Sequence, residues 1–512
     1  FPPPSTLDFI SQTTKGGEVL LRLQADQFTE DAIAITSWGG YALYPFVTKT
    51  LPNDQTAWVI NPFDFFRKAL RLPTFPIPDT TTASGRRILT IHIDGDGFIS
   101  RVPWYNNLMN GEILFKDILT HYALPTSISV IQREFEIVQP NPDLYRRAVH
   151  TARAMFKLPL VQLATHTYSH PLMWENLIEG QLNTSSLSYP SPDYLFSYNK
   201  EITGSTQFIN DTLAPNNKKV EAVFWSGNAE VKEKPLAITA NAGLKNINGM
   251  AKLYLNATPF LTNLNALGIH VAGYLHVFSP IANDFVYTDD WSSPLYRFEN
   301  VINTFELTDK PFRYKPISIY YHFYSAGSQA AFRALKRIYQ WAVQQTTIPL
   351  YITDYILKVE DFYQVAIAKK ITVPESEPMW LITNNGALRE FRWPVKSGVP
   401  DLKNSQNVAG YDQHNNSYYV HLGNKKASWL SFSQQRPKRP YLMDANAEVS
   451  YWQQDDASCI QFGLKGYVPL SFRLANMTGH QLIYNNQLMT AKKDLYRMTK
   501  NSEGQFRICA HE

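Results

Sequence analysis

Cysteine is nearly absent from this chain of 512 residues, and both cysteines lie near its C-terminus. Cys459 and Cys509 are too few to build a zinc knuckle by themselves, because such a site needs more ligands. They could form one disulfide in an oxidising compartment or remain as buried thiols. The sequence leaves both alternatives open.

Long apolar runs and strong charge are absent as well. No stretch of about 18 apolar residues occurs, which excludes a membrane-spanning helix. The formal net charge of +4 is small for this length, and no basic run is interleaved with aromatic residues, so nucleic acid is not an expected partner. The chain begins Phe1-Pro2-Pro3-Pro4, without a Met or a signal-like segment, and we expect it to be a fragment or a processed form.

Three regions follow one another along the chain, as its length predicts for a protein with more than one core. Residues 1–85 contain short strand-like runs and a Pro- and Thr-rich linker, and they are expected to be the edge of a larger domain. Residues 86–372 alternate strand and helix patterns, which predicts a parallel sheet or barrel. Residues 373–512 contain short strands separated by Asn, Gly and Pro clusters, which predicts an all-β sandwich.

Helix signals are clearest at two places in the middle region. Asn141-Pro142 can cap and open a helix whose apolar residues recur at helical spacing, and Ser328 can open another. The short apolar runs 160–164 and 350–352 that follow these helices are predicted to be buried strands.

Two carboxylates follow the strand-like run that ends at Ile93. Asp94 and Asp96 are separated by one glycine, and the carboxyl end of a buried strand is where ligands collect in α/β proteins. Two carboxylates so close cannot both ionise at low cost unless a cation lies between them. The spacing therefore indicates a metal site or a division of roles between an acid and a base.

Two histidines follow a second predicted strand end. His166 and His170 are four residues apart and can converge on one metal through their imidazole nitrogens. Such a pair also occurs in ordinary cores, but this one lies in the same alternating region as the aspartates. In a parallel barrel both loops would reach the same rim. One carboxylate with two imidazoles would leave an open position for water, as a catalytic zinc needs.

Two other interpretations of the aspartates fit less well. A calcium-binding EF-type loop would need a Glu eleven residues after Asp94, where Tyr105 stands. A phosphatase with an aspartyl nucleophile would be expected to have a small β-branched residue in place of Phe98, and it would give the two histidines no role. His92 alternates onto the same strand face as Asp94 and is expected to pack inward.

The two motifs together resemble a known family. Asp94-Gly95-Asp96-Gly97 with His166-Thr167-Tyr168-Ser169-His170-Pro171 is similar to the first two motifs of the polysaccharide deacetylases of carbohydrate esterase family 4. More narrowly, Arg86 to Tyr363 resembles the branch that modifies the Pel exopolysaccharide of Gram-negative bacteria. That resemblance includes Phe224-Trp225-Ser226-Gly227, Asn246-Ile247-Asn248-Gly249 and Ile319-Tyr320-Tyr321-His322-Phe323. Gly95 between the aspartates and the missing Arg-x-Pro third motif depart from the family at large.

The resemblance implies a fold and a set of roles. The fold would be a distorted (β/α) barrel at 86–372 with a jelly-roll-like β sandwich at 373–512, after a remnant of a preceding α/β domain at 1–85. The implied site consists of Asp94 as general base, His322 as acid, Asp96, His166 and His170 as ligands of a divalent metal, with zinc expected, and Trp225 beside the acetyl methyl group.

The resemblance also implies an activity and a setting. The chain would be a metal-dependent N-deacetylase of an N-acetylhexosamine exopolysaccharide rich in N-acetylgalactosamine. It would act in the periplasm during Pel-type biofilm polysaccharide export, with the acetylated polymer as substrate and an export-machinery protein as partner. The alternative is a polysaccharide-binding or scaffold protein in which the same metal site is idle.

Overall fold

The computed structural model describes residues 13–25, 28–52, 55–250, 252–371, 378–454 and 459–511. The chain divides into two compact units. One contains the residues up to Phe75 together with Tyr254–Leu264, and the other contains Pro76–Leu253 and Asn265–Glu512. The predicted domain boundaries at 85 and 372 stay a prediction, and residue 372 lies outside the described residues.

The first unit is a small mixed structure. A three-stranded antiparallel sheet in the order β1-β2-β3 packs Ile33 and Phe46 in its core. Its elements are β1 (Glu18–Ala25), β2 (Phe28–Thr36), β3 (Gly39–Ala42), β4 (Thr48–Thr50), β5 (Thr56–Trp58), α1 (Pro62–Ala69) and η7 (Leu261–Asn263).

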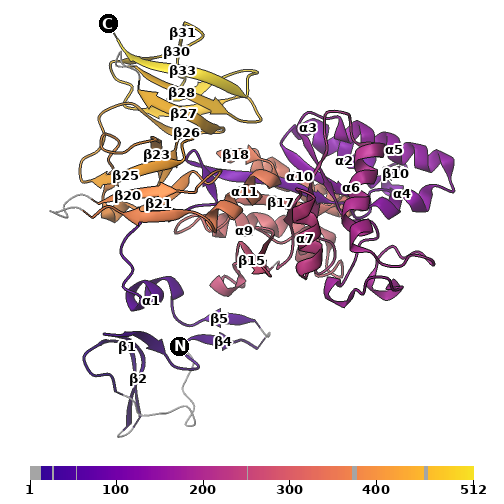
Figure 1. Cartoon of the computed structure of the whole chain (residues 1–512), viewed down its shortest axis with the longest axis horizontal. Helices are drawn as coiled ribbons and strands as arrows, with labels where there is room; N and C mark the ends of the chain where they lie inside the picture. The colour runs from indigo at the N-terminus through magenta and orange to yellow at the C-terminus, as the bar shows by residue number, and fades with distance from the viewer. Residues whose placement is uncertain are drawn as a thin grey trace. The chain divides into compact units, whose positions relative to one another are not determined.

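A parallel sheet forms the centre of the second unit (Figure 1). Its order is β14-β13-β12-β11-β8-β17, and β18 also pairs with β8. The strands are β8 (Arg86–Asp94), β11 (Thr126–Val130), β12 (Val161–Thr165), β13 (Val220–Phe224), β14 (Lys245–Ile247), β17 (Ile317–His322) and β18 (Thr347–Leu350). β8 is buried along its whole length, as its β-branched residues predict for a central parallel strand.

The sheet is only part of a barrel, which corrects the predicted (β/α) barrel. Because the last strand β18 pairs with β8 and not with β14, no ladder among the described residues closes the sheet. Helix α11 (Ile352–Phe362) and β16 (Tyr274–Val277) pack against the β14 end through Ile247, Val277 and Ile356. The apolar surface at this edge is thus buried without a closing strand.

Helices cover this sheet. They are α2 (Asn110–Leu114), α3 (Thr120–Tyr122), α4 (Gln132–Val138), α5 (Pro142–Phe156), α6 (Ser205–Phe208), α7 (Glu233–Asn241), α8 (Asp284–Tyr287), α9 (Val301–Leu307), α10 (Gln329–Ala342) and α11. The two predicted helix starts are confirmed, since Asn141 caps α5 and Ser328 caps α10 through their side chains. The strand predicted at 350–352 is wrong in position: β18 ends at Leu350 and α11 begins at Ile352.

The chain from Met379 onward folds into sheets, with a single 3-10 turn among the described residues (orange to yellow in Figure 1). A four-stranded sheet has the order β19-β20-β25-β22, a seven-stranded sheet β32-β29-β26-β23-β24-β21-β6, and a five-stranded sheet β27-β28-β33-β30-β31. The predicted all-β character is confirmed. The expected jelly roll is wrong, because a jelly roll has two sheets and the described part of this region has three.

These sheets pack face to face in two places. Trp393 on β21 stacks on Phe432 of β25 with ring centroids 3.6 Å apart. A second core joins Leu442 and Phe472 to Phe462 and Phe506. The strands are β6 (Ile77–Pro78), β19 (Ala366–Lys369), β20 (Met379–Thr383), β21 (Glu390–Pro394), β22 (Val399–Pro400), β23 (Val408–His414), β24 (Ser417–Leu422), β25 (Ala427–Ser433), β26 (Tyr441–Ala445), β27 (Glu448–Gln454), β28 (Ile460–Lys465), β29 (Ser471–Ala475), β30 (His480–Tyr484), β31 (Gln487–Met489), β32 (Leu495–Arg497) and β33 (Glu503–Ala510).

Buried charges join the central strand to the β sheets. Arg86, the first residue of β8, pairs through Nε with Asp444 Oδ1 of β26 at 2.6 Å, and both side chains are buried. Its Nη1 donates to Ser471 Oγ at 2.8 Å. Lys358 of α11 pairs with Glu448 of β27. Because an unpaired buried charge is costly, these contacts fix the β sheets to the parallel sheet.

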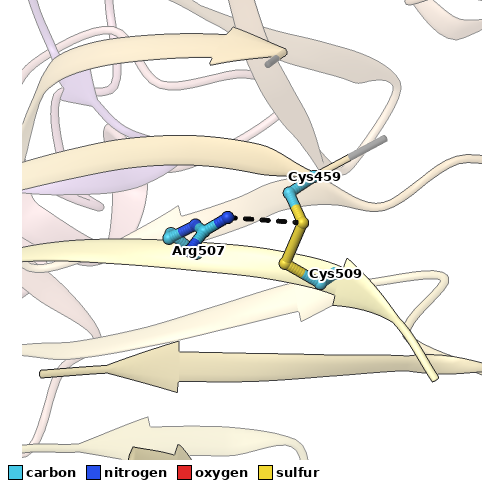
Figure 2. The surroundings of a disulfide bond; sticks show 3 residues. All are labelled: Cys459, Arg507 and Cys509. Atoms are coloured by element: carbon cyan, nitrogen blue, oxygen red, sulfur yellow. Dashed lines mark hydrogen bonds between the residues drawn. A yellow bond between two sulfur atoms is a disulfide. The ribbon is translucent and has the colours of Figure 1, made fainter. Parts of the chain in front are cut away.

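The two cysteines form a disulfide, the first of the two alternatives (Figure 2). Cys509 lies on β33 and Cys459 directly precedes β28, the strand that pairs with β33. Arg507 Nη2 lies 3.8 Å from Cys459 Sγ. The bond links residues that are 50 positions apart in the sequence and joins two adjacent strands of the five-stranded sheet, β28 and β33, near their ends.

We expect the double substitution Cys459→Ser and Cys509→Ser to destabilise the five-stranded sheet by about 2–4 kcal/mol, because the disulfide restricts a long loop in the unfolded chain. Urea unfolding followed by tryptophan fluorescence, to which Trp452 on β27 contributes as one of eleven tryptophans, measures this change. An unchanged unfolding midpoint would contradict the expectation.

Candidate active site

The end of β8 and the end of β17 bring two predicted site residues together. The two strands pair in parallel, with His322 opposite Asp94 in the register. His322 Nε2 lies 3.8 Å from Asp94 Oδ2. The neighbouring strands β11 and β12 end at the same edge of the sheet, and the loop after β12 carries both histidines of the second motif.

Asp96, His166 and His170 form a group that could hold a metal ion. His170 Nε2 lies 2.9 Å from Asp96 Oδ1, and His166 Nε2 lies 3.1 Å from Asp96 Oδ2. The three ligand atoms lie within 4.8 Å of one another. The structure therefore brings together the three residues that the spacing singled out.

The hydrogen bond of His166 determines which of its ring nitrogens faces Asp96. Its Nδ1 lies 2.8 Å from the carbonyl oxygen of Phe224, which can only accept, so Nδ1 carries the proton. In the neutral ring, Nε2 then presents a lone pair to a carboxylate oxygen. Asp96 Oδ2 is buried and receives no hydrogen bond of good geometry from any described residue. A metal ion would satisfy both atoms.

Asp94 has a different environment from Asp96. It is 2 % exposed, and Tyr320 Oη donates to its Oδ2 at 2.6 Å. Asn248 Nδ2 donates to both carboxylate oxygens at 3.2 and 3.1 Å. The Asn248 amide is itself oriented by Ser279, which donates to its Oδ1 at 3.0 Å. Asp94 is thus held by neutral donors beside the carboxylate of Asp96, and it is not one of the three residues that could hold a metal.

His322 is oriented by a carboxylate on the side away from Asp94. Its Nδ1 donates to Asp284 Oδ1 at 2.6 Å, and Ser325 Oγ donates to the other oxygen of Asp284 at 2.5 Å. Burial alone would lower the pKa of His322, but the carboxylate of Asp284 and its hydrogen bond outweigh burial and raise this pKa to about 10. His322 therefore carries a proton on Nε2, which lies 3.8 Å from Asp94 Oδ2 and 3.9 Å from Asp96 Oδ2.

Trp225 is 1 % exposed, and its ring meets Trp174 edge to face at 5.1 Å. Its Nε1 donates to Asn246 Oδ1 at 3.1 Å. This is the packing of a core side chain, and its predicted place beside an acetyl methyl group stays a prediction. Trp291 lies nearer the proposed acid, with its ring 6.0 Å from the rings of both His322 and Tyr324.

Several residues of the site have no role in the sequence-based prediction. Tyr320 could have been found, because it lies two residues before His322 and strand residues two apart share a face. Asn248 lies in the stretch Asn246-Ile247-Asn248-Gly249, which belongs to the resemblance, but it had no predicted role. Asp284 lies on α8, 38 residues before His322 in the sequence, and nothing in the local sequence of α8 links the two residues. His92, expected to pack inward, is fully buried and stacks on Tyr320 at 3.9 Å.

No family model matches the sequence, and no curated protein matches it. Among solved structures, the chain is similar to a putative polysaccharide deacetylase from Mycobacterium smegmatis, with 11% identity, a TM-score of 0.35, and 59% of this chain and 100% of that chain covered. A family 4 carbohydrate esterase from Streptomyces lividans has 13% identity and a TM-score of 0.25, with 51% and 90% covered. A 4-alpha-glucanotransferase from Thermococcus litoralis has 10% identity and a TM-score of 0.35, with 54% of this chain and only 40% of that chain covered.

At these TM-scores the likenesses do not assign the chain to a family. Among the described residues, every helix is too short or too polar to cross a bilayer.

Proposed function

We propose that the chain is a metal-dependent N-deacetylase of an acetylated polysaccharide. The observation that carries the proposal is the arrangement at the sheet edge. A carboxylate with neutral donors, Asp94, and a protonated imidazole, His322, lie 3.8 Å apart beside three atoms that fit a metal ion. Hydrolysis of an amide needs a base, an acid and a means to polarise the carbonyl group, and these groups supply all three.

The residues of this chain divide the proton transfers. Asp94 accepts a proton from the attacking water while the water oxygen forms a bond to the acetyl carbon. His322 then donates its Nε2 proton to the amide nitrogen as the carbon–nitrogen bond breaks, so that acetate and a free amine are released. Tyr320 and Asn248 hold the Asp94 carboxylate in place, and Asp284 holds the His322 ring.

Asp96, His166 and His170 would hold the metal. Two imidazole nitrogens and one carboxylate are a ligand set of catalytic zinc sites, and we propose zinc for this reason. When bound, a divalent cation there supplies a Lewis acid for the carbonyl oxygen and lowers the pKa of a coordinated water.

The finer identity rests on the sequence resemblance. We propose that the substrate is an N-acetylhexosamine polymer rich in N-acetylgalactosamine, that the chain corresponds to the deacetylase and C-terminal β regions of PelA, and that it works in the periplasm with a protein of the export machinery. The disulfide supports an oxidising compartment, where such bonds persist.

Removal of the metal is the first test. We expect a chelator to abolish acetate release from N-acetylated hexosamine oligosaccharides, and Zn²⁺ or Co²⁺ to restore it, because the metal polarises the acetyl carbonyl. Acetate release measured before chelation, after it and after metal addition gives the result. Activity that does not respond to chelation would contradict the mechanism, and glycan binding without acetate release by the metal-loaded protein would favour the scaffold function.

A further inference from the structure

Two buried glutamates that are not among the proposed site residues contact the loops on which the proposed metal ligands lie. Glu134 lies on α4 and is 1 % exposed. Its Oε1 accepts from the backbone N–H of Gly97 at 2.7 Å and its Oε2 from that of Ile99 at 3.2 Å. Tyr189 Oη also donates to Oε1, at 2.8 Å. Glu134 thus holds the loop immediately after Asp96.

Glu201 makes the corresponding contacts with the second loop. It lies on the π-helical turn Lys200–Gly204 and is fully buried. Its Oε2 accepts from the backbone N–H groups of Tyr168 and Ser169 at 3.0 and 2.9 Å. Its Oε1 accepts from Ser169 Oγ at 2.5 Å and from Tyr194 Oη at 2.8 Å. The residues that it holds lie between His166 and His170.

The second loop needs such a restraint. Thr167 has φ +69° and His170 has φ +56°, in the left-handed region that residues with a side chain rarely adopt. A backbone of this kind persists only where its surroundings fix it. The N-terminal turn of α4 adds to the restraint, because the N–H of Arg133 donates to the carbonyl of Tyr168 at 2.9 Å. One short helix therefore contacts both loops.

We propose that Glu134 and Glu201 are positioning residues of the metal site, each fixing one of the two loops on which the ligands lie. The inference rests on the proposed function, because it assumes that Asp96, His166 and His170 bind a metal. Side chains that orient metal ligands typically change metal affinity by roughly 10- to 100-fold when they are substituted. Here the glutamates would act through the backbone of the loops and not through the ligand side chains themselves.

The hydrogen-bond partners predict different responses to glutamine at the two positions. At Glu134 each carboxylate oxygen faces a backbone N–H, so the amide nitrogen of Glu134→Gln must face one of these donors. At Glu201 both backbone N–H groups face Oε2, and the partners of Oε1 are hydroxyl groups that can also accept. Glutamine can therefore replace Glu201 while both backbone N–H groups keep an acceptor.

The experiment measures the Zn²⁺ affinity of the full chain by competition with a chelating dye, together with the visible absorption spectrum of the Co²⁺ form. We expect Glu134→Gln and Glu201→Leu to weaken Zn²⁺ binding by roughly 10- to 100-fold and to alter the Co²⁺ spectrum. Glu201→Gln should keep the affinity that Glu201→Leu loses. Asp361→Ala is the matched control, since Asp361 accepts from the backbone N–H groups of Ala387 and Leu388 away from the site.

The outcomes separate this inference from the proposed function. Wild-type affinity and spectrum in both Glu134→Gln and Glu201→Leu would overturn the inference and leave the deacetylase proposal intact. An equal loss in Asp361→Ala would also overturn it, because the effect would then be one of general stability. If Glu134→Gln does not fold, the comparison of Glu201→Leu with Glu201→Gln decides. A wild-type protein that binds no Zn²⁺ would overturn the proposed function itself and the inference with it.

Discussion

Asp94→Asn should bind metal as the wild type does and lose about 100- to 10,000-fold in turnover, the usual effect of losing a general base. The amide oxygen of the new side chain can keep the contacts with Tyr320 and Asn248, so the local structure should persist. An amide cannot accept the proton of the attacking water. Acetate release and elemental analysis of the same preparation measure both quantities.

The metal content of the variant is the internal control for this result. A protein that has lost its metal together with its turnover would show that Asp94 is a ligand and that the two aspartates have exchanged roles. Full turnover in a variant with a full metal site would show that another group accepts the proton.

Asp96→Ala should give the opposite pattern, with the metal lost first and the activity lost as a consequence. Asp96 supplies the carboxylate between the two imidazoles, at 2.9 and 3.1 Å from their Nε2 atoms. We expect metal affinity to fall by at least the roughly 10- to 100-fold that is typical of substitutions beyond the ligands themselves. Zinc titration of the metal-free protein measures the change.

Asp117→Ala is a suitable control for this variant, because Asp117 is another carboxylate of the same unit and contacts Tyr105 and Lys336. It should bind zinc as the wild type does. If Asp96→Ala also retains its zinc, then His166 and His170 do not complete a site with this loop, and the deacetylase proposal loses its physical basis.

The parts of the site that the sequence predicts are those with a local signal. Asp96 follows a buried strand, and His166 and His170 share one loop at a spacing that suits a metal, so their convergence follows from a parallel sheet with a common edge. The helix starts at Asn141 and Ser328 were likewise predictable, because capping depends on neighbours in the sequence.

The parts that could not be predicted depend on distant pairing. Asp284 meets His322 across 38 residues, and Glu134 meets the loop after Asp96 across 37 residues. No periodicity or spacing records such contacts, because they arise only when the sheet is assembled. The open edge of the sheet could not be predicted either, because it depends on which strand β18 pairs with.

Strand β8 begins at an ion pair with the C-terminal sheets and ends at the proposed base, so one rigid segment belongs to both regions. In evolutionary terms, the β sheets are not an exchangeable accessory module. A recombination event that replaced them would leave Arg86 buried without Asp444, and the cost would fall on the strand that positions Asp94. Descendants of this chain should therefore inherit the two regions together, with changes at Arg86 and Asp444 tolerated only as a pair.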